Sequence, residues 1–133
     1  MTEEAQSVLL VDDEDMIRTL FETILHNSLP ECKVGAAANG KEAVEAFKEF
    51  QYRVILMDLH MPIMTGEQAF KEIESYCKET DQEMPSVIFC TGFAPPDTVQ
   101  DIIAKSQTHC LLSKPVTGDV IVEQIKSRLQ AAG

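Results

Sequence analysis

The amino-acid sequence predicts a doubly wound α/β fold built on a single five-stranded parallel sheet. Five short apolar runs alternate along the chain with five stretches whose apolar residues recur at helical spacing. The runs are too short for helices, and most are bounded by turn-forming or charged residues, as is typical of buried strands. An alternation of strands and helices favours parallel pairing, right-handed crossovers and helices on both faces of the sheet.

The individual elements are predicted from these two periodicities. The predicted strands are Val8–Val11, Val34–Ala38, Val54–Met57, Val87–Cys90 and Cys110–Leu112. The predicted helices carry five apolar stripes: Ile17, Leu20, Phe21, Ile24 and Leu25; Ala43, Val44 and Phe47; Ala69, Phe70, Ile73, Tyr76 and Cys77; Val99, Ile102 and Ile103; Ile121, Val122, Ile125 and Leu129. Local signals mark the starts of three helices, namely Asn39-Gly40, Gly66 and Pro95-Pro96-Asp97.

The composition is that of one soluble globular domain spanning residues 1–133. Of the 133 residues, 44% are hydrophobic and 25% are charged. The longest apolar runs have about four residues, so we expect no transmembrane helix. The first residues are acidic and lack an apolar segment, which argues against a signal peptide. We therefore expect a cytoplasmic protein whose four cysteines are reduced.

The net charge of −11 restricts the partners that the chain can bind by itself. Phosphate backbones and anionic lipid headgroups would be repelled, so we expect no direct binding of nucleic acid or of membranes. The same acidic excess favours binding of a cation wherever several carboxylates converge.

Polar side chains follow four of the five predicted strands. Asp12 and Asp13 follow the first strand, Asp58 the third, Thr91 the fourth and Lys114 the fifth. Ligands of doubly wound sheets bind at the carboxyl ends of the strands, so these side chains should lie at one edge of the sheet. Together they are hard to explain as helix caps and turns.

The chemistry of this set indicates phosphoryl transfer. Clustered carboxylates stay ionised beside a divalent cation, and their hard oxygens suit Mg²⁺ or Mn²⁺. An ammonium group and a hydroxyl are suited to the remaining oxygens of a phosphoryl group. Because the sequence contains no serine–histidine, cysteine–histidine or Walker-type motif, a carboxylate must be the nucleophile. Asp58 is the natural candidate, since it stands apart from the adjacent pair Asp12 and Asp13.

These residues carry a resemblance to a known family. The matching segments are Val8-Leu9-Leu10-Val11-Asp12-Asp13-Glu14, Asp58-Leu59-His60-Met61-Pro62-Ile63-Met64-Thr65-Gly66, Thr91-Gly92 and Ser113-Lys114-Pro115. Over essentially its whole length, the chain resembles the receiver domain of two-component response regulators. The resemblance implies a flavodoxin-like fold with strand order 2-1-3-4-5.

The resemblance also implies a role for each residue. Asp58 would accept a phosphoryl group from a phosphohistidine on a sensor histidine kinase or phosphotransfer protein. Asp13, Asp58 and the backbone carbonyl of His60 would bind Mg²⁺ directly, and Asp12 would act through water. Thr91 would move to hydrogen-bond the phosphoryl group, and Lys114 would neutralise it. The Lys114-Pro115 bond would be cis.

The output implied by the resemblance is a conformational switch rather than turnover of a substrate. A surface formed by residues 95–106 and 110–131 would bind a downstream protein effector. The chain would then be a regulatory domain with self-phosphorylation and slow self-dephosphorylation, and not an enzyme in its own right.

The sequence departs from the family pattern near the site. Leu111 stands where an aromatic residue usually reports phosphorylation, so aromatic-coupled switching is in question. Gly92 replaces the usual alanine and keeps access to the site open. His60 and Phe93 stand where side chains flank the path of an attacking water.

Two other interpretations stay open at this stage. A pseudo-receiver would act as a binding module without phosphorylation. A haloacid dehalogenase-like phosphatase would use Asp13, Thr91 and Lys114 in a similar order, but it would leave Asp58 unexplained.

Overall fold

The computed structural model describes residues 6–106 and 108–132, and it confirms the predicted α/β fold. Five parallel strands pair in the order β2-β1-β3-β4-β5. The strands are β1 (Ser7–Val11), β2 (Lys33–Ala37), β3 (Val54–Asp58), β4 (Ser86–Thr91) and β5 (Cys110–Ser113). The helices are α1 (Asp15–Ser28), α2 (Gly40–Glu49), α3 (Gly66–Glu79), α4 (Asp97–Lys105) and α5 (Gly118–Ala132).

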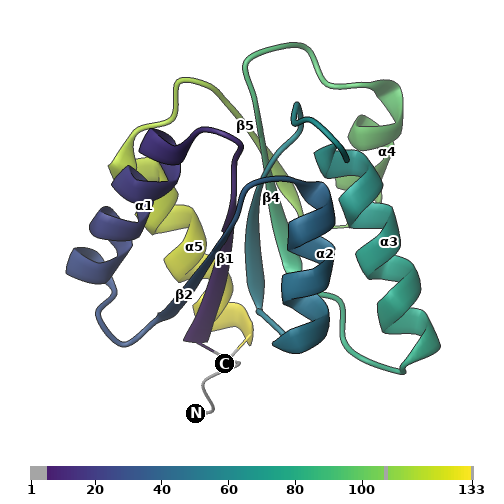
Figure 1. The fold of residues 1–133 in the computed structure, drawn as a ribbon, viewed down its shortest axis with the longest axis horizontal. Helices are drawn as coiled ribbons and strands as arrows, with labels where there is room; N and C mark the ends of the chain where they lie inside the picture. The colour runs from purple at the N-terminus through teal and green to yellow at the C-terminus, as the bar shows by residue number, and fades with distance from the viewer. Residues whose placement is uncertain (1–5, 107, 133) are drawn as a thin grey trace.

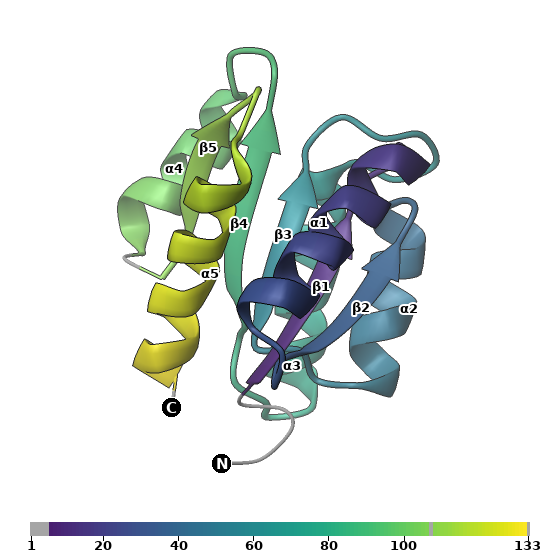
Figure 2. The same ribbon diagram turned by 90° about the vertical axis from the view of Figure 1, so that its left-hand side faces the viewer.

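The helices form two layers around the sheet. Helices α1 and α5 cover one face, and α2, α3 and α4 cover the other (Figure 1). All strands run in the same direction, so their carboxyl ends meet at the upper edge of Figure 2. The polar residues that follow the predicted strands were expected to lie at these carboxyl ends.

The core is divided by the sheet into two apolar clusters. Successive strand residues point to opposite faces, so Leu9 and Val11 pack beneath α2 to α4, whereas Val8 and Leu10 pack beneath α1 and α5. The three central strands β1, β3 and β4 are almost wholly buried. The side chains at their ends are therefore carried by deeply buried strands.

The outer strands correct one prediction. The sequence suggested that the second run is a buried strand, but β2 lies at an edge of the sheet and four of its five residues are exposed or half-buried. Strand β5, at the other edge, is also partly exposed. The predicted stripe on α1 was wrong at Leu20, which is 52% exposed, while Leu25 is buried. Apolar composition marked these residues as core, but only the strand order decides which strands are covered on both sides.

Helix starts follow the predicted signals. The Asn39 side chain caps α2 by accepting a hydrogen bond from the backbone N–H of Glu42. Thr65 and Gln68 form a reciprocal capping box at the start of α3. Pro96 directly precedes α4. None of the helices in the described ranges is long and apolar enough to cross a membrane.

Candidate functional site

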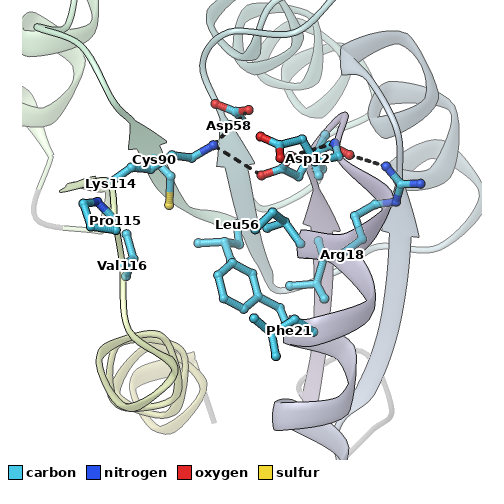
Figure 3. A pocket seen from close by; sticks show the side chains of 14 residues that line it. Asp12, Arg18, Phe21, Leu56, Asp58, Cys90, Lys114, Pro115 and Val116 are labelled. Carbon is cyan, nitrogen blue, oxygen red and sulfur yellow. Dashed lines mark hydrogen bonds and ion pairs between the residues drawn. The ribbon is translucent and has the colours of Figure 1, made fainter.

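Three of the predicted site residues, Asp12, Asp58 and Lys114, converge at the carboxyl ends of the strands (Figure 3). Asp12 directly follows β1, Asp58 ends β3, and Lys114 directly follows β5. Thr91 ends β4, and its backbone carbonyl accepts a hydrogen bond from the Lys114 N–H at 2.8 Å. The site thus combines residues that are up to 102 positions apart in the chain.

Lys114 links the two buried carboxylates. Its Nζ lies 3.2 Å from Oδ2 of Asp58 and 3.4 Å from Oδ2 of Asp12. Asp58 is 5% exposed and Asp12 is 7% exposed, so water screens these charges weakly. The ammonium group therefore offsets part of the repulsion between the two aspartates.

The pKa values of the pair reflect this crowding. Burial raises the pKa of Asp58, and the Asp12 carboxylate adds to this effect, more than the Lys114 ammonium and the His60 N–H lower it. Burial by itself would lower the pKa of Lys114, but the carboxylates of Asp58 and Asp12 raise it above its ordinary value. Lys114 is therefore a permanent cation at neutral pH.

An acidic cluster at this edge fits a divalent cation. One carboxylate oxygen from each of Asp12, Asp13 and Asp58 lies within 4.8 Å of the others. Three carboxylates exceed the single charge of Lys114, and their hard oxygens are the ligand type that Mg²⁺ prefers. Asp13 is exposed, so this side of the cluster is open to water, which Mg²⁺ characteristically retains. The residues present therefore fit the predicted ion.

The backbone beside Asp58 is closely fitted to the carboxylate. The His60 N–H donates a hydrogen bond to Oδ1 of Asp58 at 3.3 Å. A side chain on Gly66 would collide with the backbone carbonyl of Asp58 and with the Met57 side chain. Gly66 is therefore needed for the close approach of α3 to the end of β3, and not merely as a residue that starts a helix.

The opposite rim is formed by the segment after β4. The Thr91 hydroxyl accepts a hydrogen bond from the Phe93 N–H at 3.1 Å, and Thr91 is 2% exposed. Gly92 is exposed, and a Cβ placed on it would lie 4.0 Å from the nearest atom, the Lys114 Cβ. Phe93 is 72% exposed, and its ring contacts the ring of His60. Both predicted rim residues thus lie at the mouth of the site.

A cavity of about 360 Å³ lies beneath the carboxylates, between α1 and the segment after β5 (Figure 3). Its walls are mainly apolar and include Phe21, Leu56, Cys90 and Val116. Burial raises the pKa of the Cys90 thiol to about 12, so this cysteine stays a neutral thiol at physiological pH. All four cysteines are free thiols; Cys32, Cys77 and Cys90 are buried, and Cys110 is half-buried.

Leu111 lies on the α4 side of the sheet. It is partly buried against the apolar cluster that contains Val99, whereas Cys110 and Leu112 pack with the cluster beneath α1 and α5. The alternation of strand residues thus places Leu111 on the α4 side of β5 and its two neighbours on the α5 side. The predicted cis bond between Lys114 and Pro115 is present.

The sequence reasoning missed two side-chain contacts with the backbone, one at the site (Arg18) and one at the amino-terminal end of β4 (His109). Arg18 binds the loop that carries Asp12, and the spacing of Arg18 from Asp15 by three helical positions could have indicated an ion pair there. His109 is buried and accepts a hydrogen bond from the Val87 N–H. No motif in the sequence marks this imidazole.

The comparison with protein families agrees with this geometry. A family model for the response regulator receiver domain matches residues 8–126. The chain belongs to the response regulator receiver family. It is thus a regulatory domain of two-component signalling, and this membership removes the phosphatase alternative.

Curated receiver proteins match the chain over most of its length. A chemotaxis protein CheY from Halobacterium salinarum is 32% identical over 127 residues, which cover 96% of this chain and 99% of that protein. A CheY from Thermotoga maritima is 42% identical over 118 residues, covering 89% and 92% of the two chains. A protein-glutamate methylesterase/protein-glutamine glutaminase from Methanococcus maripaludis is 36% identical, but the match covers 34% of that protein. Receiver domains thus occur among these relatives both as nearly whole proteins and as parts of longer ones.

Solved receiver structures share the fold. The chemotaxis protein CheY4 from Vibrio cholerae has a TM-score of 0.72 at 25% identity, with 91% of this chain and 96% of that chain covered. A receiver domain from Vibrio parahaemolyticus has a TM-score of 0.79 at 23% identity, with 96% and 92% covered. The strand order and the two helical layers are therefore those of this family.

Proposed function

We propose that Asp58 accepts a phosphoryl group from a phosphohistidine of a sensor histidine kinase or phosphotransfer protein, in a reaction that depends on Mg²⁺. The observation that carries the proposal is the placement of the Asp58 carboxylate, which lies 3.2 Å from the Lys114 ammonium and within 4.8 Å of carboxylate oxygens of Asp12 and Asp13. Membership of the receiver family supports the same role.

The transfer requires no other nucleophile. An Asp58 carboxylate oxygen forms a bond to phosphorus while the bond between phosphorus and the donor imidazole nitrogen breaks, and the nitrogen keeps the electron pair. Because Asp58 is buried, its oxygen is held in place and poorly hydrated, which favours attack on a phosphoryl group delivered in line.

The surrounding groups stabilise the added charge. Lys114 already lies 3.2 Å from Asp58 and would stay close to an oxygen of the attached phosphoryl group. The Thr91 hydroxyl would donate to a second oxygen. Asp13, Asp58 and the His60 carbonyl would hold Mg²⁺, with Asp12 acting through water, and the ion would neutralise charge on the transferring phosphoryl group.

The expected consequence is a change of conformation that controls a protein partner. The proposed contact surface comprises residues 95–106 and 110–131, which include α4, β5 and all but the last residue of α5. Relatives named as chemotaxis proteins and as a regulatory protein, AtoC, support an output of this kind without identifying the partner.

Labelling with acetyl phosphate in Mg²⁺ tests the proposal. We expect one base-labile phosphoryl group per chain, and its loss in Asp58→Asn. Asp101→Asn, which changes an exposed aspartate on α4, is the matched control and should label fully. Asp13→Ala should lose most of the labelling and its dependence on Mg²⁺. Full labelling of Asp58→Asn would disprove the assignment.

A binding module without phosphorylation is the second candidate, favoured by the replacement of the usual aromatic residue by Leu111. Beryllofluoride, which mimics a phosphoryl group on a carboxylate, separates the two. A Mg²⁺-dependent change in the amide spectrum is expected for a phosphoacceptor, and an unchanged spectrum for the module.

A further inference from the structure

Arg18 lies in the first turn of α1 and directs its guanidinium group toward the acidic loop after β1 (Figure 3). Its Nη1 donates a hydrogen bond to the backbone carbonyl of Asp12 at 2.5 Å, and its Nη2 forms an ion pair with Asp15. The Arg18 side chain is 16% exposed although its partner Asp15 is 88% exposed. The guanidinium group is therefore packed against the loop rather than extended into solvent.

Each backbone and side-chain polar group of Asp12 contacts another residue. Its N–H donates to the carbonyl of Ala37 at 3.2 Å. Its Oδ1 accepts from the Glu14 N–H at 2.9 Å, and its Oδ2 pairs with Lys114. Arg18 holds the remaining group, the carbonyl, at the point where β1 ends and its ladder of backbone hydrogen bonds stops.

The Asp12 carbonyl belongs to the peptide plane that joins Asp12 to Asp13. Because a peptide unit is planar, fixing this carbonyl also fixes the direction in which the chain enters Asp13. Asp13 is exposed, and its carboxylate forms no ion pair with any residue of the described ranges. The contact with Arg18 therefore holds the peptide that leads into Asp13 by its carbonyl group.

We propose that Arg18 is a positioning residue for the cation site, which holds the peptide between Asp12 and Asp13 so that both carboxylates converge with that of Asp58. The inference rests on the proposed Mg²⁺ dependence. Arg18 touches neither the acceptor oxygen nor the transferred group, and acts through the backbone of Asp12.

The charge of Arg18 and its contact with the Asp12 carbonyl predict opposite effects on the affinity for Mg²⁺. A guanidinium group beside a dication site repels the cation, so removing the charge by itself should tighten Mg²⁺ binding. Loss of the carbonyl contact should loosen it, because misplaced ligands weaken metal sites by about tenfold or more. The direction of the change therefore distinguishes positioning from electrostatics.

The chain offers a closely matched control in Arg53. The Arg53 side chain is also 16% exposed and also pairs with one exposed carboxylate, that of Glu83, at 3.3 Å. Arg53 directly precedes β3 and therefore lies at the amino ends of the strands, whereas the site lies at their carboxyl ends. Arg53→Met removes the same charge and a similar ion pair without touching the acidic loop.

The experiment measures the Kd for Mg²⁺ by calorimetric titration, at a temperature where each variant is folded. We expect Arg18→Met to weaken binding about tenfold, and Arg18→Lys to weaken it although the charge is kept. Asp15→Asn, which leaves the carbonyl contact in place, and Arg53→Met should change the Kd less than twofold. Without Mg²⁺, Arg18→Lys should shift the amide signals of Asp13 and Glu14, whereas Arg53→Met should not.

Suppose that the wild-type chain binds Mg²⁺ and that Arg18→Lys binds it equally well or more tightly. This result would overturn the positioning role and leave the proposed function intact. If Arg18→Met does not fold, the comparison of Arg18→Lys with the wild type decides the question. A wild-type chain with no Mg²⁺ binding at millimolar concentration would overturn this inference together with the proposed Mg²⁺ dependence.

Discussion

The ring of His60 meets the ring of Phe93 edge to face across the mouth of the site, with 5.1 Å between the ring centroids and 83° between the ring planes. The two residues come from different loops, after β3 and after β4, and both are exposed. An apolar ring therefore occupies the rim where a water would have to approach an Asp58 phosphoryl group.

This contact predicts slow self-dephosphorylation. Phe93 has no group that can orient a water in line with the bond to phosphorus, and an imidazole held against it is a poor substitute for a carboxylate or amide. Phe93→Glu should accelerate the loss of phosphate about tenfold, which is ~1.4 kcal/mol in the barrier. The decay of radiolabelled protein measures this, with Phe93→Leu as the apolar control. A wild-type lifetime of seconds, or an equal rate in Phe93→Glu, would contradict it.

The second prediction concerns the output surface. Leu111 packs against the apolar cluster on the α4 side, and its strand β5 pairs with β4 up to Thr91 and Ser113, so a displacement of Thr91 can reach the α4 side through β5 even without an aromatic ring. Amide shifts caused by beryllofluoride should therefore extend from Thr91 into residues 95–106 and 110–131. The shift in population can correspond to about 1–3 kcal/mol of coupling. Shifts confined to the acidic pocket would mean that Leu111 does not transmit the change.

The third prediction compares two glycines beside the site. Gly66→Ala should destabilise the fold by about 1–3 kcal/mol and reduce labelling of Asp58, because its Cβ would collide with the carbonyl of that residue. Gly92→Ala should fold at least as well as the wild type, since its Cβ would be about as far from other atoms as an ordinary contact. Denaturant unfolding and acetyl phosphate labelling of both variants provide the comparison. Equal effects of the two alanines would count against the close approach at Gly66.

The fourth prediction is a loss of stability in mild acid caused by His109. Burial lowers the pKa of His109, with Glu74 on α3 opposing and Arg128 on α5 reinforcing the shift. The Nδ1 atom must stay unprotonated to accept the Val87 N–H at 3.0 Å. The unfolded chain therefore takes up a proton first. Stability should be full above pH ~6.5 and should fall as the pH drops toward the lowered pKa, by up to ~1.4 kcal/mol per pH unit.

Unfolding titrations at pH 7.5 and pH 5.5 measure this dependence. His109→Gln can still supply an acceptor for Val87 but does not titrate, so it should lack the His109 part of the pH dependence. A mutant with the same pH dependence as the wild type would show that other groups cause it.

The fifth prediction concerns Ile63 in the loop after Asp58. Its φ of 69° is unusual for a β-branched residue, and the Met64 N–H donates to the Pro62 carbonyl across it at 2.7 Å. Ile63 is 77% exposed, so little packing would be lost on truncation. Ile63→Gly should raise the free energy of unfolding by about 1 kcal/mol. Ile63→Val, which keeps the branched Cβ, should give no such gain in the same denaturant titration.

The sequence predicted the parts of the molecule that depend on local pattern. Both faces of β1, β3 and β4 are covered, so nearly every residue of these strands is apolar. The sequence analysis recognised them by these apolar runs. The convergence of Asp12, Asp58 and Lys114 followed from one rule about parallel strands, and the structure brings these three side chains into contact.

The remaining features depend on tertiary arrangement. Exposure of β2 follows from its place at the edge of the sheet, which its alanine-rich sequence does not disclose. The hydrogen bond from Val87 to His109 joins residues 22 positions apart, and no periodic pattern links them. The contact of Arg18 with Asp12 involves a backbone carbonyl, which has no signature in the sequence.

The residues of the site are supported by strands of unequal stability. Asp12 and Asp58 are anchored at the ends of central strands, but Lys114 arrives from β5, a four-residue strand at the edge of the sheet. The strand pairs with β4 up to Ser113 and Thr91, and the Lys114 N–H adds one further bond to the Thr91 carbonyl. Edge strands open locally more readily than central ones. Local separation of β5 would carry the Lys114 ammonium away and would leave the two buried carboxylates without that counter-charge. The balance of charge around Asp58 therefore depends on the pairing of β5 with β4 as much as on the residues that line the pocket.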